Sequence, residues 1–175
     1  MSDKLNISGL TNDSIVDGPG LRYTIFTQGC YHKCEGCHNP QTHDSTKGKL
    51  VDIDIILDEI LKNPLLEGVT FSGGEPFLQA GVLGTLGIKI KEANPSLNIV
   101  TYTGYTFEEL LDIIEKTQSL DYIKLLRVTD YLIDGRFVID KKSLDVKFRG
   151  STNQRILYSS KSLEEKKAVL CTEFD

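Results

Sequence analysis

The sequence lacks any hydrophobic run near the roughly 18 apolar residues that a membrane-spanning helix needs. Residues 1–6 contain no apolar segment of the signal-peptide type, which predicts a cytoplasmic protein. An excess of positive charge is also missing: the formal net charge of −5 argues against general nucleic-acid binding. Without repeats, low-complexity tracts or linkers, residues 1–175 predict one domain, with a core over 15–158 and a C-terminal extension over 159–175.

Cysteine is scarce, and three of its four copies lie in one loop. Cys30, Cys34 and Cys37 have the spacing C-x3-C-x2-C, which can direct three thiolates to one centre. In a reducing compartment, clustered cysteines are more often metal ligands than disulfides. On spacing alone, the loop fits a zinc ion with His32 or His38 as fourth ligand, or a four-iron cluster with one iron open to a small molecule. A second C-x2-C pair, which zinc ribbons usually have, is absent.

The hydrophobic pattern predicts alternating strands and helices. β-favouring residues over 21–28 predict a strand that runs directly into the cysteine loop. Apolar residues at helical spacing predict a helix over 53–61, and the capping box Thr106–Glu109 predicts the start of another. Residues 11–20 and 41–50 are expected to be loops. Further strands are predicted at 69–71, 98–102, 131–134 and 154–158, and further helices at 80–93, 120–127 and after Ser162.

This alternation predicts parallel βαβ units and therefore an α/β fold. With room for about five to six strands, the chain is too short for a closed eight-stranded barrel of about 250 residues. We therefore expect an open, partial parallel β/α barrel. The remaining cysteine, Cys171, lies far from the loop and is expected to be an ordinary buried residue.

A second motif, Ser72-Gly73-Gly74-Glu75-Pro76, follows the strand predicted at 69–71. Because α/β folds place their chemistry at the carboxyl ends of the strands, this motif and the cysteine loop should share one edge of the sheet. The two glycines expose backbone groups to a ligand, and Glu75 adds an acceptor suited to an ammonium group. Alone, the motif is equally typical of a strand-to-helix turn with a solvated carboxylate.

Together the two motifs resemble the signature of the radical S-adenosylmethionine (SAM) superfamily, C-x3-C-x2-C after one strand and a GGE segment after the next. The resemblance implies a [4Fe–4S] cluster on Cys30, Cys34 and Cys37, with SAM on the fourth iron. Members tend to carry an aromatic residue before the third cysteine, where this chain has Gly36. Contacts from the backbone of residues 36–38 to the adenine are therefore expected in place of an aromatic side chain. The implied SAM-binding residues are Gly36, Cys37, His38, Gly73, Gly74, Glu75, Thr101 and Thr103.

The segment Asp17-Gly18-Pro19-Gly20-Leu21-Arg22 is similar to the run that precedes the cysteine strand in glycyl-radical-enzyme activases. Residues 102–105, 132–137 and 148–155 resemble the activases whose protein substrate is an anaerobic ribonucleoside-triphosphate reductase. The resemblance covers about 15–157 and implies a radical SAM oxidoreductase that generates a glycyl radical on that reductase. No catalytic side chain is required, since the cluster and SAM carry the chemistry.

The same resemblance implies a flavodoxin-type electron donor. Such donors are acidic, so Lys33, Lys141, Lys142 and Lys147 are expected to form a basic patch near the cluster. Three other interpretations remain open: an activase of the pyruvate formate-lyase type, a short radical SAM enzyme acting on a deazapurine precursor, and a zinc-stabilised binding module. The Gly-Gly-Glu run at a strand end and the missing second cysteine pair argue against the zinc module.

Overall fold

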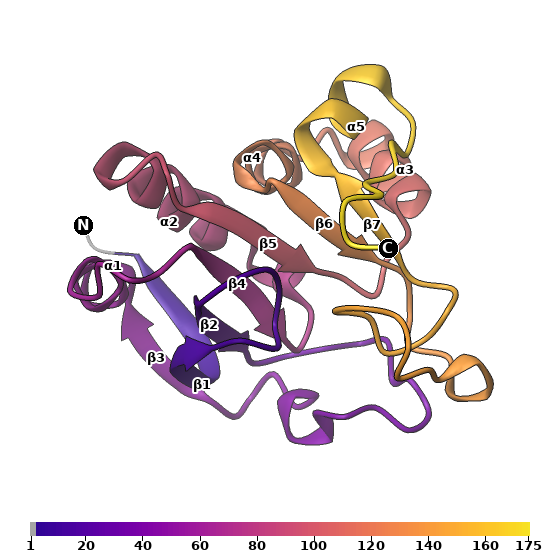
Figure 1. Cartoon of the computed structure of the whole chain (residues 1–175), viewed down its shortest axis with the longest axis horizontal. Coiled ribbons are helices and arrows are strands. Elements are labelled where there is room, and N and C mark those ends of the chain that lie inside the picture. Colours follow the sequence, from indigo (N-terminus) through magenta and orange to yellow (C-terminus); the bar gives the residue numbers. More distant parts are fainter. Residues whose placement is uncertain (1–2) are drawn as a thin grey trace.

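The computed structural model describes residues 3–175, which fold around one open sheet of seven strands (Figure 1). The strands are β1 (Lys4–Ser14), β2 (Arg22–Thr27), β3 (Lys49–Asp52), β4 (Gly68–Gly73), β5 (Asn98–Tyr102), β6 (Tyr131–Asp134) and β7 (Arg155–Tyr158). Their order across the sheet is β3-β1-β2-β4-β5-β6-β7. The four central strands β2, β4, β5 and β6 are parallel, whereas β1, β3 and β7 pair antiparallel. The α/β class is confirmed.

The sheet has more strands than predicted because β1 and β3 extend it beyond β2. The loop predicted over 11–20 is wrong for its first four residues, which belong to β1, and the loop predicted over 41–50 ends in β3. Strand β1 contains Asn6, Gly9 and Asp13, which are depleted in strands, and its pairing with β2 has two register shifts. Long-range pairing therefore overrides a weak local signal.

Five helices occur in residues 3–175: α1 (Ile53–Leu61), α2 (Ala80–Ala93), α3 (Phe107–Thr117), α4 (Leu120–Val128) and α5 (Ser159–Glu165). Helices α1, α2 and α4 cover one side of the sheet, whereas the cysteine loop and the 135–150 segment lie on the other (Figure 1). The capping box of Thr106 and Glu109 at α3 is confirmed. Helix α5 begins earlier than predicted, and the Ser162 hydroxyl lies inside it, donating to the Tyr158 carbonyl. None of these helices combines the length and apolar character that a membrane crossing requires.

A glycine stripe on α2 lets this helix pack closely on α4. A Cβ atom at Gly87 would lie 2.5 Å from Cγ2 of Val128, and one at Gly84 would lie 2.7 Å from Cδ of Lys124. Each contact is too short for a real side chain, so glycine is needed for the approach of the two helices. The cost of glycine in a helix, about 1 kcal/mol relative to alanine, is thus offset by packing.

The sheet buries apolar side chains on both faces. Alternate residues of the strands divide between a large cluster beneath the helices and a smaller cluster on the opposite face. The C-terminal residues cover the smaller cluster: the Cys171 amide donates to Ile156, and Phe174 packs edge-on against Tyr131 and Phe148. Cys171 is 3% exposed, as expected for an ordinary buried residue. The smaller cluster consists of Val100, Ile133, Ile156 and Cys171.

Candidate functional site

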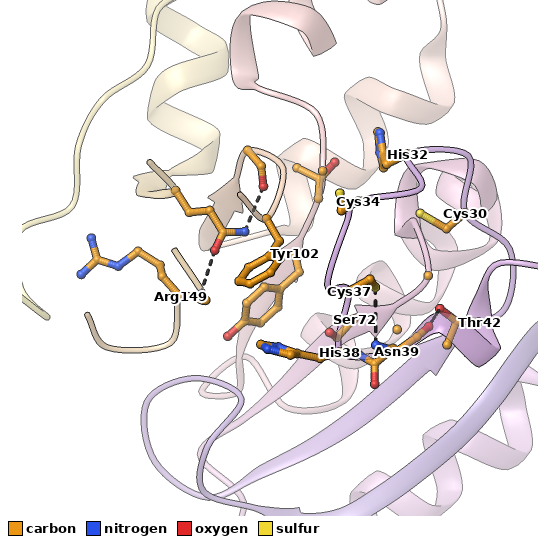
Figure 2. Close-up of a pocket in the computed structure, with 18 of the residues that line it drawn as sticks. Cys30, His32, Cys34, Cys37, His38, Asn39, Thr42, Ser72, Tyr102 and Arg149 are labelled. Carbon is orange, nitrogen blue, oxygen red and sulfur yellow. Dashed lines mark hydrogen bonds between the residues drawn. The ribbon is translucent and has the colours of Figure 1, made fainter. Parts of the chain in front are cut away.

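A cavity of about 600 Å³ lies at the carboxyl ends of β2, β4 and β5, on the side of the sheet that α1, α2 and α4 leave open. The cysteine loop forms one wall, and Tyr102 and the segment around Arg149 form the opposite wall (Figure 2). Both motifs singled out in the sequence therefore meet at one site. Its lining includes Asp17, Phe26, Cys30, His32, Cys34, Cys37, His38, Ser72, Gly73, Gly74, Tyr102, Thr103, Gly104, Phe137, Phe148, Arg149 and Gln154.

Backbone hydrogen bonds and the glycine at position 36 shape the cysteine loop. The Cys30 amide donates to the His43 carbonyl, and the Cys37 amide donates to the Cys34 carbonyl in a tight turn. Gly36 has φ of +74°, and a Cβ atom there would lie 2.7 Å from Cδ1 of Ile139. The backbone conformation therefore favours glycine at this position, and a side chain there would also have to displace the end of the Ile139 side chain.

The second motif is held directly against the cysteine loop. The Gly74 amide donates to the Thr27 carbonyl, and the Glu75 amide donates to the Gly29 carbonyl, each at 2.8 Å. A Cβ atom at Gly74 would lie 2.3 Å from the Gly29 oxygen, so only glycine permits this approach. The two glycines of the motif consequently serve the contact between the loops as well as the surface of the cavity.

The donor set of the cavity fits an iron–sulfur cluster. Three thiols line it, and the Cys37 sulfur also accepts a hydrogen bond from the Asn39 amide. Within residues 3–175, no three His, Cys, Asp or Glu side chains converge on a point that would hold a single metal ion. His32, a candidate zinc ligand, instead directs its Nε2 atom to Glu75 at 2.7 Å. Three thiols with open space beside them suit a four-iron cluster that keeps one iron free.

Burial raises the pKa of the Cys30 thiol, and the negative charge of Glu75 adds to the rise. A thiol of this kind becomes a thiolate readily only when a bound metal centre takes up the charge. The environment of Cys30 therefore does not favour a free reactive thiolate.

Glu75 lies behind the cavity wall. Its side chain is 1% exposed, and its carboxylate oxygens accept hydrogen bonds from protein donors on both sides. Within the described chain, the residues that line the cavity include Gly73 and Gly74 but do not include Glu75. The structure thus brings the two glycines to the cysteines and turns the carboxylate away from the open space.

Thr103 and Thr101, the two threonines predicted to bind SAM, differ in position: one lines the cavity and the other does not. Thr103 lines the cavity, and its hydroxyl donates to Glu75 at 2.8 Å. Thr101 is fully buried on the helix side of the sheet, where its hydroxyl lies 2.8 Å from that of Thr129. His38 lines the cavity, and the centroid of its ring lies 5.0 Å from that of the Phe137 ring.

Further cavity residues, Tyr102, Phe148 and Arg149, lie in the segments 102–105 and 148–155, which resemble the activases in sequence. The Tyr102 hydroxyl donates to the Phe148 carbonyl at 2.7 Å, and burial raises the pKa of this phenol above its ordinary value. Arg149 pairs with Asp175 at 3.1 Å and points away from the cysteines (Figure 2). Strand alternation offers a signal for Tyr102, since it places this residue on the face opposite to Thr101. For Phe148 and Arg149 the only signal was the resemblance of the 148–155 segment to the activases.

The Asp17–Arg22 segment is organised around Arg22, which is fully buried. Its guanidinium donates to the Thr70 hydroxyl, the Pro19 carbonyl and two strand carbonyls at 2.7–3.2 Å. Burial lowers the pKa of Arg22 to about 10. These bonds fasten the turn to β4 and β5, and Asp17 thereby becomes part of the cavity wall.

Fold and site together define an α/β protein with a three-cysteine centre at the carboxyl edge of its parallel strands. The family model described as "4Fe-4S single cluster domain" matches residues 16–157. Similar proteins include the anaerobic ribonucleoside-triphosphate reductase-activating proteins of Enterobacteria phage T4, Vibrio cholerae serotype O1 and Escherichia coli strain K12. The phage protein is 33% identical over 81% of this chain and 86% of its own length. The Vibrio protein is 35% identical over 81% of this chain, the Escherichia protein 34% identical over 80%, and each is covered over 90% of its length. The chain belongs to the 4Fe–4S single cluster domain family and, within it, to the family of these activating proteins.

Proposed function

We propose that this protein is a radical SAM activase that generates a glycyl radical on an anaerobic ribonucleoside-triphosphate reductase. The main observation in support is that Cys30, Cys34 and Cys37 line one cavity with Gly73 and Gly74. The names of the relatives supply the protein substrate. The open sheet, with four parallel strands and the site on the side without α1, α2 and α4, is in our proposal the partial β/α barrel of the radical SAM type.

In this proposal the three cysteines hold a [4Fe–4S] cluster, and SAM occupies the rest of the cavity. With both bound, the reduced cluster would supply one electron to the SAM sulfonium, so that the S–C5′ bond would break to give methionine and a 5′-deoxyadenosyl radical able to take a hydrogen atom from a glycine of the reductase. The chain's own residues position SAM and exclude water. Gly73 and Gly74 border the methionyl end, and Thr103 lies beside them.

In this proposal the adenine of SAM lies between the cysteine loop and the 137–141 segment. Support comes from His38 and Phe137, whose rings lie 5.0 Å apart at the cavity wall. Ile139 and Phe137 lie beside Gly36, where related proteins carry an aromatic residue before the third cysteine. Phe137 supplies an apolar ring from another part of the chain, and the Gly36–His38 backbone provides the polar edge.

Electron delivery from an acidic flavodoxin-type donor is a further part of the proposal. Lys33 lies in the cysteine loop, and the turn containing Lys141 packs against that loop through Ile139. Lys33, Lys141, Lys142 and Lys147 are all exposed. Reversing these four charges should slow cluster reduction and flatten its salt dependence, since encounter between opposite charges is screened by salt. An unchanged rate would remove the patch from the proposal. A reducing, cytoplasmic location accords with the clustered thiols.

The decisive experiment uses anaerobically purified protein. We expect a brown protein with about four irons per chain, which forms a glycyl radical doublet on an anaerobic ribonucleoside-triphosphate reductase when SAM and a reductant are added. A colourless protein with stoichiometric zinc after iron–sulfide reconstitution would exclude the proposal. A doublet on a pyruvate formate-lyase alone would assign a different protein substrate to the same cofactors. Turnover of a purine precursor without a doublet would assign a small-molecule substrate to them.

A further inference from the structure

The buried carboxylate of Glu75 has four protein donors. Oε1 lies 2.7 Å from His32 Nε2, 2.8 Å from the Thr103 hydroxyl and 2.8 Å from the Gly104 amide. Oε2 accepts a hydrogen bond from the Phe77 amide at 3.0 Å. A carboxylate has about four lone-pair sites. Three donors thus engage Oε1, and Oε2, which has one, is enclosed with the rest of a side chain that is 1% exposed and does not line the cavity. The carboxylate therefore offers no open site to the ammonium group of a ligand.

The four donors come from three separate segments of the chain. His32 lies between two of the cluster cysteines, Thr103 and Gly104 follow β5, and Phe77 lies in the turn after β4. Glu75 therefore connects the cysteine loop to two neighbouring strand ends. Removing it would leave several buried donors without an acceptor at one point.

His32 is enclosed on its other sides as well. Its side chain is 8% exposed, and its ring meets the Tyr105 ring edge to face, with centroids 4.6 Å apart. A Cβ atom at Gly104 would lie 2.4 Å from Cδ2 of His32, so the backbone of Gly104 forms the floor beneath the imidazole. With Glu75 and Gly104 in place, the loop between Cys30 and Cys34 is anchored at its middle.

We propose that Glu75 is a positioning residue: through His32 it holds the Cys30–Cys34 arm in the geometry that accepts the cluster, and it does not contact the ammonium group of SAM. The part that concerns SAM rests on the proposed function, whereas the anchoring of the loop does not. Glycine backbone at positions 73 and 74 and the Thr103 side chain remain as the surface that SAM meets.

The anchoring is tested on cluster-free protein by hydrogen–deuterium exchange. We expect Glu75→Gln to raise amide exchange at least tenfold in residues 29–38, because the loop loses a charged hydrogen bond. Glu59→Gln is the matched control, since Glu59 accepts a hydrogen bond from Tyr23 on the other side of the sheet. This control should leave exchange at 29–38 unchanged. Unchanged exchange at 29–38 in Glu75→Gln would overturn the proposal.

A double-variant cycle tests whether Glu75 acts through His32. We expect the rate at which a chelator removes iron to rise in Glu75→Gln and in His32→Ala, and the double variant to be no faster than the faster single variant. Multiplicative effects would show independent roles and overturn the mechanism. If Glu75→Gln fails to fold, His32→Ala and its exchange at 29–38 provide the same test.

A ligand cycle separates positioning from ammonium binding. Dissociation constants are measured for SAM and for an analogue without the α-amino group, in the wild type and in Glu75→Gln. The dissociation constant of the analogue divided by that of SAM measures what the ammonium group contributes to binding. We expect Glu75→Gln to change this ratio less than twofold, since the carboxylate does not reach the ligand. A ratio that falls about tenfold or more would show a charged hydrogen bond to the ammonium and overturn the proposal. If the protein binds no SAM at all, the proposed function fails while the exchange test still decides the anchoring.

Discussion

The Tyr102 hydroxyl donates a hydrogen bond to the Phe148 carbonyl, which joins the end of β5 to the loop on the far side of the cavity. Phe148 in turn packs edge-on against Phe174 near the C-terminus. The cavity wall opposite the cysteines is therefore supported by the last residues of the chain, which lie outside the region matched by the family model.

Replacing Tyr102 by phenylalanine should lower the free energy of unfolding by about 1 kcal/mol, because a half-buried carbonyl loses its donor. Exchange in residues 143–150 should rise, while iron content stays constant. Urea unfolding and hydrogen–deuterium exchange measure both effects. Tyr131→Phe is the control, since its hydroxyl makes only an exposed 3.4 Å bond to Glu173. Equal effects of the two variants would contradict the role assigned to Tyr102.

The four cysteines should separate into two groups by iron analysis. Cys34→Ser should reduce the iron content after anaerobic reconstitution to a small fraction of the wild-type value, because a thiolate ligand is lost. Cys171→Ala should retain the full iron content, since this thiol is buried in the smaller apolar cluster, with Val100, Ile133 and Ile156. It should instead lower the free energy of unfolding by about 1 kcal/mol through a small cavity. Iron loss in Cys171→Ala would contradict the assignment of the ligands.

A methyl group on the α2 glycine stripe should destabilise the protein although alanine is the better helix former. In Gly87→Ala the new Cβ meets Val128 at 2.5 Å, so we expect a loss of about 1–3 kcal/mol by overpacking. Gly9→Ala is the control: no atom lies within 4 Å of its Cβ position, and a change below about 0.5 kcal/mol is expected. Thermal and urea unfolding give both values. A stabilised Gly87→Ala would show that α2 and α4 can move apart freely.

The ion pair between Asp134 and Arg155 lies at the N-terminus of α3. Asp134 is 1% exposed and also accepts a hydrogen bond from the Phe107 amide at 2.8 Å. Arg155→Gln should lower the free energy of unfolding by about 2 kcal/mol, since a buried carboxylate loses its charged donor. Lys116→Gln, which breaks an exposed pair with Asp112, should cost about 0.5 kcal/mol or less.

The same variant should change the acid response of the protein. The hydrogen bond from Arg155 lowers the pKa of Glu108 below its ordinary value. A lowered folded-state pKa means that the stabilisation is present above the unfolded pKa of about 4.3 and is lost as the pH falls through the folded value. Unfolding free energies measured from pH 6 to pH 3 should therefore decline less in Arg155→Gln than in the wild type. A parallel decline would exclude this contribution.

The sequence alone determined the parallel part of the fold and the location of the site. Strands β2, β4, β5 and β6 and the helices between them follow from local hydrophobic periodicity, and a parallel sheet brings its carboxyl ends to one edge. The cysteine loop and Gly73–Gly74 each follow a strand directly, so their meeting was predictable from that rule alone.

The tertiary structure alone decided the antiparallel strands β1 and β3, the far wall of the cavity and the role of Glu75. The turn pattern around Gly73 and Gly74 suggested a carboxylate free to meet a ligand. However, the donors that bind Glu75 Oε1 lie up to 43 residues away in the chain. Likewise, Phe148 reaches Tyr102 across 46 residues. Periodicity reports only which face of its own element a residue occupies, whereas a buried polar group is assigned by the distant partners that satisfy it.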